Sequence, residues 1–94
     1  MAYITMSNWK TSKWSDDINK LAKTKFIPMI LAVGAKNVQM VKTGKDTFCV
    51  ISYYENEEMA IDAKEKIAVI RSQASSELPM AMITAQEGNV LASS

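Results

Sequence analysis

The side chains that could line a binding site are few and widely spaced along the chain. A ligand cleft usually combines aromatic walls with a small number of polar groups that orient the ligand. The aromatic walls could enclose a small apolar or aromatic molecule, and a guanidinium could hold an anionic group. By these criteria the candidate pocket residues are Asn8, Trp9, Trp14, Tyr53, Tyr54 and Arg71.

Each candidate also has a purely structural interpretation, which the residue types favour. Trp14, at the expected start of a helix, and the two adjacent tyrosines are aromatic residues of the kind that fill cores and interfaces. Arg71 could form a surface ion pair with an acid such as Glu55. The structural interpretation is weaker for Trp9, because we expect this residue in a polar loop.

The chain contains no histidine. This absence removes the commonest general base, the commonest zinc ligand and the usual proximal haem ligand, so Ser-His-Asp and Cys-His mechanisms are excluded. The one cysteine, Cys49, lies in an expected strand and is interpreted as a small buried hydrophobe. With one cysteine and scattered acidic residues, we expect neither a metal site nor a cofactor.

Length and composition are those of one globular domain over residues 1–94, with 48% hydrophobic residues, 22% charged residues and a net charge of +1. The lysines at positions 10, 13, 20, 23 and 25 are interpreted as a solvated helix face, so no nucleic-acid partner is expected. The longest apolar run, residues 26–35, is too short to span a bilayer, so no membrane insertion is expected. The first residues lack the features of a secretory signal, and a cytoplasmic location is the default expectation.

Hydrophobic periodicity predicts four main strands, at residues 2–6, 36–43, 46–54 and 80–85. A turn is expected at residues 87–89, followed by a short terminal strand at 90–92. The stretch 38–54 is apolar on both faces of the expected hairpin, because the even-numbered and odd-numbered residues are both mainly apolar. A two-residue turn at Gly44 and Lys45 would pair Val41 with Phe48, and a longer loop would shift these partners. Which of the two tyrosines lines a cleft stays open, because one step of register decides it.

Two helices are predicted between these strands. The first begins near residues 13–16, capped by Ser12 or Ser15, is kinked near residues 24–26 ahead of Pro28, and ends at Gly34. The second begins after Asn56 and stops before Pro79. Its expected buried stripe consists of Met59, Ala60, Ala63, Ile67, Ile70 and Ala74.

The predicted order is strand, helix, strand, strand, helix, strand, which is the α+β, ferredoxin-like βαββαβ arrangement. Right-handed crossovers place both helices on one face of an antiparallel sheet, so the other face has no cover from its own chain. An uncovered apolar face usually marks an interface. We therefore expect a homodimer that packs sheet on sheet.

Four segments of the chain resemble the dimeric α/β-barrel group of small ferredoxin-like proteins, which includes the antibiotic-biosynthesis monooxygenase-like domains. They are PMILAVGA at residues 28–35, VQMVKTG at 38–44, ISYY at 51–54 and the helical segment 63–74, with KIAVIR at its centre. The resemblance covers residues 16–94 and extends to uncharacterised marine bacterial members. These segments are patterns of packing and turning, so they indicate a fold more than a chemistry.

The resemblance implies an assembly and a place for a ligand. In that group two protomers bring their sheets together as a barrel, and enzymatic members place substrate in a cleft between helices and sheet. Members include haem-degrading enzymes, cofactor-free monooxygenases and proteins without known activity. This chain departs from the haem-degrading type because it has no histidine, whereas Asn8 beside Trp9 is similar to the Asn and Trp pairing of some cofactor-free oxygenases.

Three functional hypotheses follow. The first is a homodimeric ferredoxin-like domain that binds a small apolar or aromatic molecule. The alternative is a cofactor-independent monooxygenase-like enzyme, in which aromatic and amide groups orient an electron-rich substrate that reacts with oxygen itself. The third is a regulatory module that binds a ligand without turnover.

Overall fold

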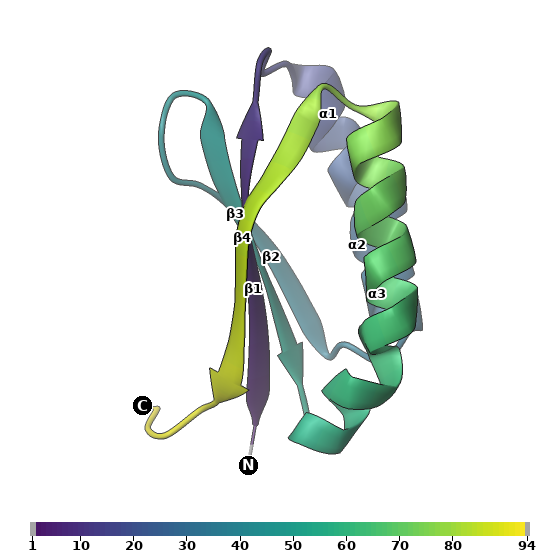
Figure 1. Cartoon of the computed structure of the whole chain (residues 1–94), viewed down its shortest axis with the longest axis vertical. Helices are drawn as coiled ribbons and strands as arrows, with labels where there is room; N and C mark the ends of the chain where they lie inside the picture. The colour runs from purple at the N-terminus through teal and green to yellow at the C-terminus, as the bar shows by residue number, and fades with distance from the viewer. Residues whose placement is uncertain (1, 94) are drawn as a thin grey trace.

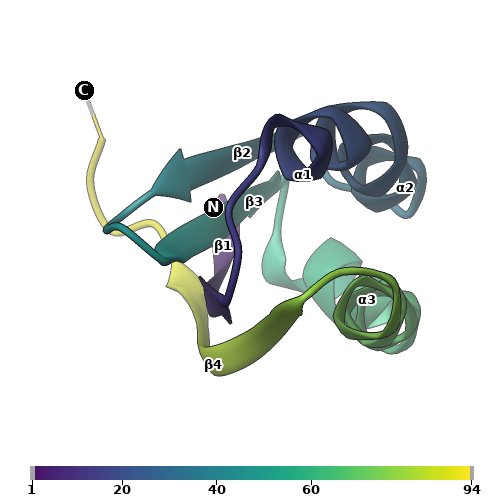
Figure 2. The same cartoon turned by 90° about the horizontal axis from the view of Figure 1, so that it is seen from above.

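The computed structural model describes residues 2–93, which form an antiparallel four-stranded sheet with helices on one face (Figure 1). Viewed from above, the helices lie together on one side of the sheet (Figure 2). The strand order is β2-β3-β1-β4, as the predicted ferredoxin-like βαββαβ fold requires. In chain order the elements are β1 (Tyr3–Thr11), α1 (Asp16–Leu21), η1 (Ala22–Phe26), α2 (Ile27–Ala32), β2 (Asn37–Lys42), β3 (Thr47–Tyr54), α3 (Glu57–Glu77) and β4 (Met80–Asn89).

Strand β1 is longer than the sequence predicted, and the expected polar loop around Trp9 is wrong. Ser7 and Thr11 lie in the strand and are buried because they find partners there. The Trp9 indole Nε1 donates to Ser7 Oγ at 2.7 Å, and Thr11 Oγ1 donates to the Pro79 carbonyl at 2.9 Å. Satisfied hydroxyls of this kind cost little to bury, so the polar sequence did not mark a loop.

The first helical segment is interrupted by a single π-helical turn, η1, at the place where the sequence predicted a kink. Pro28 has no backbone N–H to donate to the preceding turn, and a wider turn is one way for a helix to accommodate that loss. Thr24 Oγ1 donates to the Lys20 carbonyl at 2.8 Å within the same region. Ser15 is the N-cap residue of α1, but its side chain makes no capping hydrogen bond, contrary to the prediction.

The β2–β3 hairpin has a longer loop than two residues. Val41 pairs with Cys49 and Lys42 with Phe48, so the register of the two-residue turn is wrong. The N–H groups of Thr43 and Gly44 both donate to the Thr47 carbonyl, at 3.0 and 3.3 Å, and close this longer loop.

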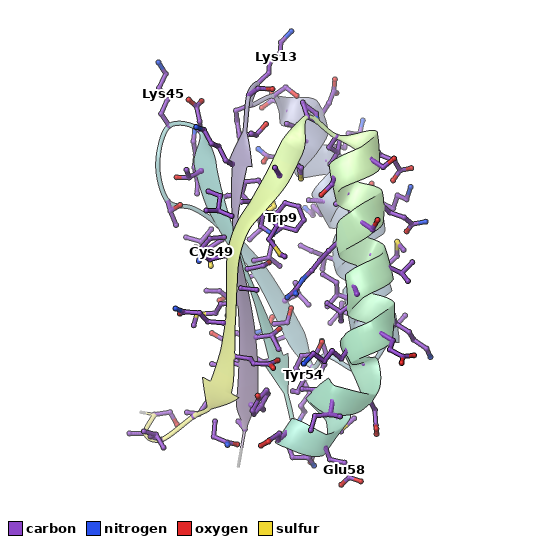
Figure 3. The ribbon with its side chains drawn as sticks, in the orientation of Figure 1. Trp9, Lys13, Lys45, Cys49, Tyr54 and Glu58 are labelled. Carbon is purple, nitrogen blue, oxygen red and sulfur yellow. The ribbon has the colours of Figure 1, made fainter. Side chains whose placement is uncertain are left out.

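The register places the two adjacent tyrosines on opposite sides of the sheet. Phe48 and Tyr54 lie on the helix-covered face and are almost fully buried, whereas Tyr53 lies on the other face. Figure 3 shows Trp9 and Tyr54 on the helix side of the sheet and Cys49 on the opposite side.

Helix α3 begins after Asn56 and ends before Pro79 as predicted, whereas strand β4 extends past its predicted end. The Asn56 side chain accepts a hydrogen bond from the Met59 N–H at 3.0 Å, which confirms the predicted cap. Met59 was expected in the buried stripe, but it is 37% exposed because it lies in the first turn of α3, near the end of the sheet. Residues 87–89 continue β4 instead of forming a turn, and 90–92 are not a strand, although the Val90 N–H donates to the Ala2 carbonyl.

A bulge in β4 sets which of its side chains face the helices. Thr84 pairs with Asn8, but Met82 pairs with Trp9, so Ile83 is an extra residue between them. With strict alternation Ile83 would pair with Trp9 and face the helices. Because Ile83 is extra, Met82 takes that place and faces the helices instead.

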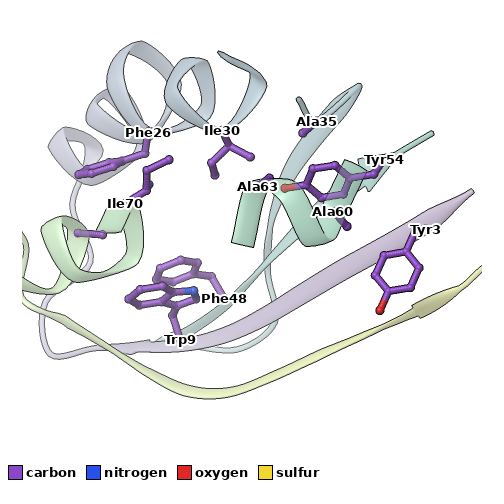
Figure 4. Packing of buried hydrophobic residues seen from close by; sticks show 11 residues of the cluster. Tyr3, Trp9, Phe26, Ile30, Ala35, Phe48, Tyr54, Ala60, Ala63 and Ile70 are labelled. Atoms are coloured by element: carbon purple, nitrogen blue, oxygen red, sulfur yellow. The ribbon is translucent and has the colours of Figure 1, made fainter. Parts of the chain in front are cut away.

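The core lies between the helices and the sheet (Figure 4). Trp9 and Phe48 stack with ring centroids 6.1 Å apart and planes 6° from parallel, and Trp14 meets Phe48 edge-on at 5.6 Å. The buried hydrophobic cluster consists of Tyr3, Trp9, Phe26, Ile30, Ala35, Phe48, Tyr54, Ala60, Ala63, Ile70 and Ala74.

The face of the sheet away from the helices, here called the open face, is apolar along its two central strands. Ile4 lies opposite Tyr53 and Met6 opposite Ile51, and all four side chains are only partly buried. The edge strands contribute polar side chains to the same rows, among them Gln39 on β2 and Gln86 on β4. Among residues 2–93, no helix is long and apolar enough to cross a membrane.

Gly34 provides a test of the predicted end of the first helical segment. Its φ is +119°, a conformation that L residues with a side chain rarely adopt, although a Cβ there would meet only Met59 Cε at 3.9 Å. We expect Gly34→Ala to lower the free energy of unfolding by about 1–2 kcal/mol through backbone strain alone. Gly88→Ala is the control, because a Cβ at Gly88 meets no atom within 4 Å and its φ is not positive. The free energies of unfolding would be measured in urea. Equal values for the two variants would contradict the positive φ at Gly34.

Candidate functional site between the helices and the sheet

A small apolar cavity of about 60 Å³ lies in the core between the first helical segment, helix α3 and the sheet. Its apolar walls include Phe26 and Ile30 from the first helical segment, Phe48 from β3 and Ile70 from α3, which Figure 4 shows facing one another across the core. The polar groups that reach it come from Thr5, Ser7, Ser52 and Arg71. The cavity therefore has apolar walls with a few polar groups, three from the sheet and one from α3.

A second pocket of about 270 Å³ adjoins this cavity between α3 and β4. Three residues, Thr5, Ile67 and Arg71, line both spaces. The remaining lining residues of the second pocket are Tyr54, Ala60, Lys64, Ala85, Gln86 and Glu87. The second pocket is more polar than the first, and Arg71 stands where the two meet.

The aromatic wall of the cavity is held rigidly. Trp9 is only 3% exposed, stacks on Phe48, and has its indole N–H already bonded to Ser7. Lys42 Nζ lies 5.2 Å from the centroid of the Trp14 ring, a cation–π contact at the outer edge of the aromatic group. Trp9 can therefore offer a ligand its ring but no free hydrogen-bond donor.

Arg71 is half-buried and has no carboxylate partner among the described residues. The ion pairs of residues 2–93 are Lys25–Glu77 at 2.6 Å and Lys64–Glu87 at 3.8 Å, so the expected pair with Glu55 does not form. Burial lowers the pKa of Arg71 below its ordinary value, while Tyr54 and Glu87 oppose this shift. Burial likewise raises the pKa of Tyr54 above 10.0, with Arg71 lowering it and Glu87 raising it.

The structure brings three of the six candidate residues together. Trp9 and Arg71 line the apolar cavity, and Tyr54 and Arg71 line the adjoining pocket. Trp14 packs on Phe48 without lining either space. The other two, Asn8 and Tyr53, lie on the open face.

Asn8 and Trp9 do not share a pocket, because consecutive side chains of a strand point to opposite faces. The Asn8 amide Nδ2 donates to Thr84 Oγ1 at 3.0 Å across the open face. Trp9 points into the core between the sheet and the helices. The sequence neighbours that resembled an oxygenase pair are therefore separated by the sheet itself.

Thr5, Lys64, Ile67 and Glu87 are pocket residues that sequence reasoning did not select. Ile67 precedes Arg71 by four positions in α3, so the helical spacing already placed the two on one face. Glu87 was missed because it was assigned to a turn. Strand alternation would have placed Thr5 on the same face as Trp9 had β1 been recognised as continuous.

No group of three or more potential metal-ligating side chains is present among residues 2–93. Cys49 lies on the open face, and burial raises the pKa of its thiol. A raised pKa keeps a thiol protonated at neutral pH, which makes it a poor nucleophile and a poor ligand.

No family model and no curated protein sequence matches the chain. Solved structures do match its fold. MupZ from Pseudomonas fluorescens superposes with a TM-score of 0.70 at 13% identity, over 92% of this chain and 69% of MupZ. A dimeric ferredoxin-like protein from an uncultured marine organism gives 0.65 at 10% identity, over 99% of this chain and 97% of the other.

NE2512, a protein of unknown function from Nitrosomonas europaea, gives a TM-score of 0.64 at 19% identity, over 100% of this chain and 94% of the other. The chain has the fold of the dimeric ferredoxin-like proteins. This finding confirms the resemblance and the fold class inferred from the sequence. At such low identity the likeness extends to the fold and not to any chemistry.

The buried phenol of Tyr54 predicts a loss of stability at alkaline pH. Because burial raises the pKa of Tyr54 in the folded chain, the unfolded chain loses this proton first, near pH 10. The stabilising contribution is therefore complete below pH 10 and is lost as pH rises through the folded-state pKa. We expect the free energy of unfolding of Tyr54→Phe to fall less steeply than that of the unmodified protein between neutral pH and about pH 11. The free energies of unfolding would be measured in urea at each pH. The same pH dependence in both proteins would contradict the raised pKa of Tyr54.

Proposed function

We propose that residues 1–94 act as a single ferredoxin-like domain that forms a homodimer through the open face. We further propose that each protomer binds a small apolar or aromatic molecule between its helices and its sheet. The observation that carries the binding proposal is the apolar cavity of about 60 Å³, which opens beside a more polar pocket of about 270 Å³. A mostly apolar space reached by a few polar groups is the usual form of a small-molecule site.

An empty cavity in the core lowers the stability of the folded chain. Residual cavities in protein cores cost about 24 cal/mol per Å³, so a space of this size costs on the order of 1–2 kcal/mol. That is a large fraction of the stability available to so small a chain. Binding of a ligand offsets this cost, which supports a ligand as the reason for the space.

The homodimer is supported by the composition of the open face. Ile4, Met6, Ile51 and Tyr53 line a broad shallow hollow there together with C-terminal residues that include Leu91, which is 91% exposed. A second copy of the same face offers a matching apolar strip with amides at its edges, as a twofold interface requires. The fold neighbours from marine organisms are described as dimeric, which agrees with this arrangement.

The monooxygenase-like alternative has less support. Its orienting amide, Asn8, is bonded to Thr84 on the open face and cannot reach a molecule that lies beside Trp9. The test is oxygen consumption with phenolic or quinol substrates. If the protein consumed oxygen and Trp9→Phe abolished this activity, the enzyme hypothesis would be favoured over binding without turnover.

The dimer predicts opposite outcomes for two neighbouring substitutions. Ile51 lies on the open face, whereas Val50 lines the cavity on the helix face. We expect Ile51→Asp to yield a folded monomer by light scattering and circular dichroism, because the charge is placed in the interface. Val50→Asp is expected to unfold the chain, because it buries an unpaired carboxylate. A folded Ile51→Asp dimer would rule out the open face as the interface.

The ligand site predicts that filling the cavity blocks binding. Ala74 lines the cavity, and Ala74→Val adds two carbon atoms to it. We expect the affinity for 1-hexanol, a neutral straight-chain probe, to fall about tenfold or more by isothermal titration calorimetry, because the variant occupies the space that the probe needs. Ala32→Val is the matched control, because Ala32 is exposed and lines neither space. Equal affinity in both variants, or no binding by the unmodified protein, would refute a ligand in this cavity.

A further inference from the structure

Arg71 is the side chain from which the chemical class of the ligand can be inferred. It lines the apolar cavity, the adjoining pocket and a third hollow that it shares with Trp9 and Met82. Among residues 2–93, no other residue lines all three of these spaces. Any molecule that extends from the core cavity toward the gap between α3 and β4 therefore passes the guanidinium.

The core cavity is too small to hold a whole ligand, so the ligand must extend from it into the adjoining pocket. Apolar cavities known to hold a benzene molecule measure about 150 Å³, which is well above the space inside this core. An aromatic or branched ligand must therefore occupy the adjoining pocket of about 270 Å³ as well. One end of the ligand lies among apolar side chains, and the remainder lies beside Arg71.

The charges around the second pocket set the charge of the ligand. Lys64 and Arg71 contribute two positive charges and Glu87 one negative charge, so the lining carries a net charge of +1. Glu87 is already paired with Lys64 at 3.8 Å, whereas Arg71 has no such partner among residues 2–93. One anionic group would neutralise the pocket, whereas a dianion would leave it with a net negative charge.

The geometry of a guanidinium narrows the class further. Arginine binds planar carboxylates through two parallel hydrogen bonds, and burial strengthens such bonds because less water competes for the donors. Thr5 and Tyr54 line the same pocket, and a hydroxyl group is a hydrogen-bond donor suited to an anion. The burial that lowers the pKa of Arg71 also means that this charge is only partly hydrated, so an anion would compensate it.

We infer that the ligand is an amphipathic monocarboxylate, with its carboxylate on Arg71 in the gap between α3 and β4 and its apolar end in the core cavity. This inference rests on the proposed function, because it requires a ligand in that cavity. It adds the charge of the ligand, its orientation and the residue that selects it.

The experiment compares two straight-chain probes that differ only in the polar end, hexanoate and 1-hexanol, by isothermal titration calorimetry. The unmodified protein is expected to bind the carboxylate about 10- to 100-fold more tightly, the range typical of hydrogen bonds between charged groups. Arg71→Met, which keeps an unbranched apolar side chain, should abolish this preference by lowering the affinity for the carboxylate to about that for the alcohol. Lys66→Met, at an exposed α3 position outside both spaces, should retain the full preference.

The outcomes separate this inference from the proposed function. Equal affinity for the two probes in the unmodified protein would overturn the monocarboxylate inference and leave the apolar site in place. A carboxylate preference that persists in a folded Arg71→Met variant would overturn the role of Arg71. If Arg71→Met does not fold, Arg71→Lys replaces it, and the loss of bidentate geometry should still lower the preference severalfold. Failure of both probes to bind would contradict the proposed function as well.

Discussion

The structure depends on the pairing of β1 with a neighbour on each side. β3 and β4 both bond antiparallel to it along nearly its whole length, so both of its edges are paired and its register is fixed on each side. Successive side chains of β1 therefore point alternately to the helix-covered face and to the open face. Tyr3, Ser7 and Trp9 enter the core, and Ile4 and Asn8 are left on the open face. The cavity floor and the proposed interface are thus two sides of one strand.

This constraint explains how much of the fold the sequence could predict. The order of elements, the Asn56 cap and the positive φ of Gly34 follow from local signals, and all three are confirmed. The errors occur where partners far apart in the sequence override local preference. Ser7 is polar in sequence yet buried, because Trp9 donates to it, and the segment at Glu87 reads as a turn yet forms a strand, because β1 pairs with it.

The candidate site was less predictable than the fold for the same reason. Residue types alone selected Trp9, Tyr54 and Arg71, which do lie together, but they also selected Asn8 and Tyr53, which lie on the other face. Choosing among them required the hairpin register and the continuity of β1, and neither is encoded within a short window. The register depends on how the loop at residues 43–46 closes, and small differences in loop length reverse every side chain of the strand.

The position of Arg71 is best explained by an external partner. A half-buried guanidinium loses hydration, and a chain that needed only stability could have placed an apolar residue there or paired the charge internally. Glu87 lies across the same pocket, but it pairs with Lys64 at the surface. The bulge at Ile83 reorients the earlier part of β4 and brings Met82 into the hollow that Arg71 and Trp9 share. The result is a cation with an apolar cavity on one side and open space on the other, an arrangement that an amphipathic anion completes and that the protein's own side chains do not.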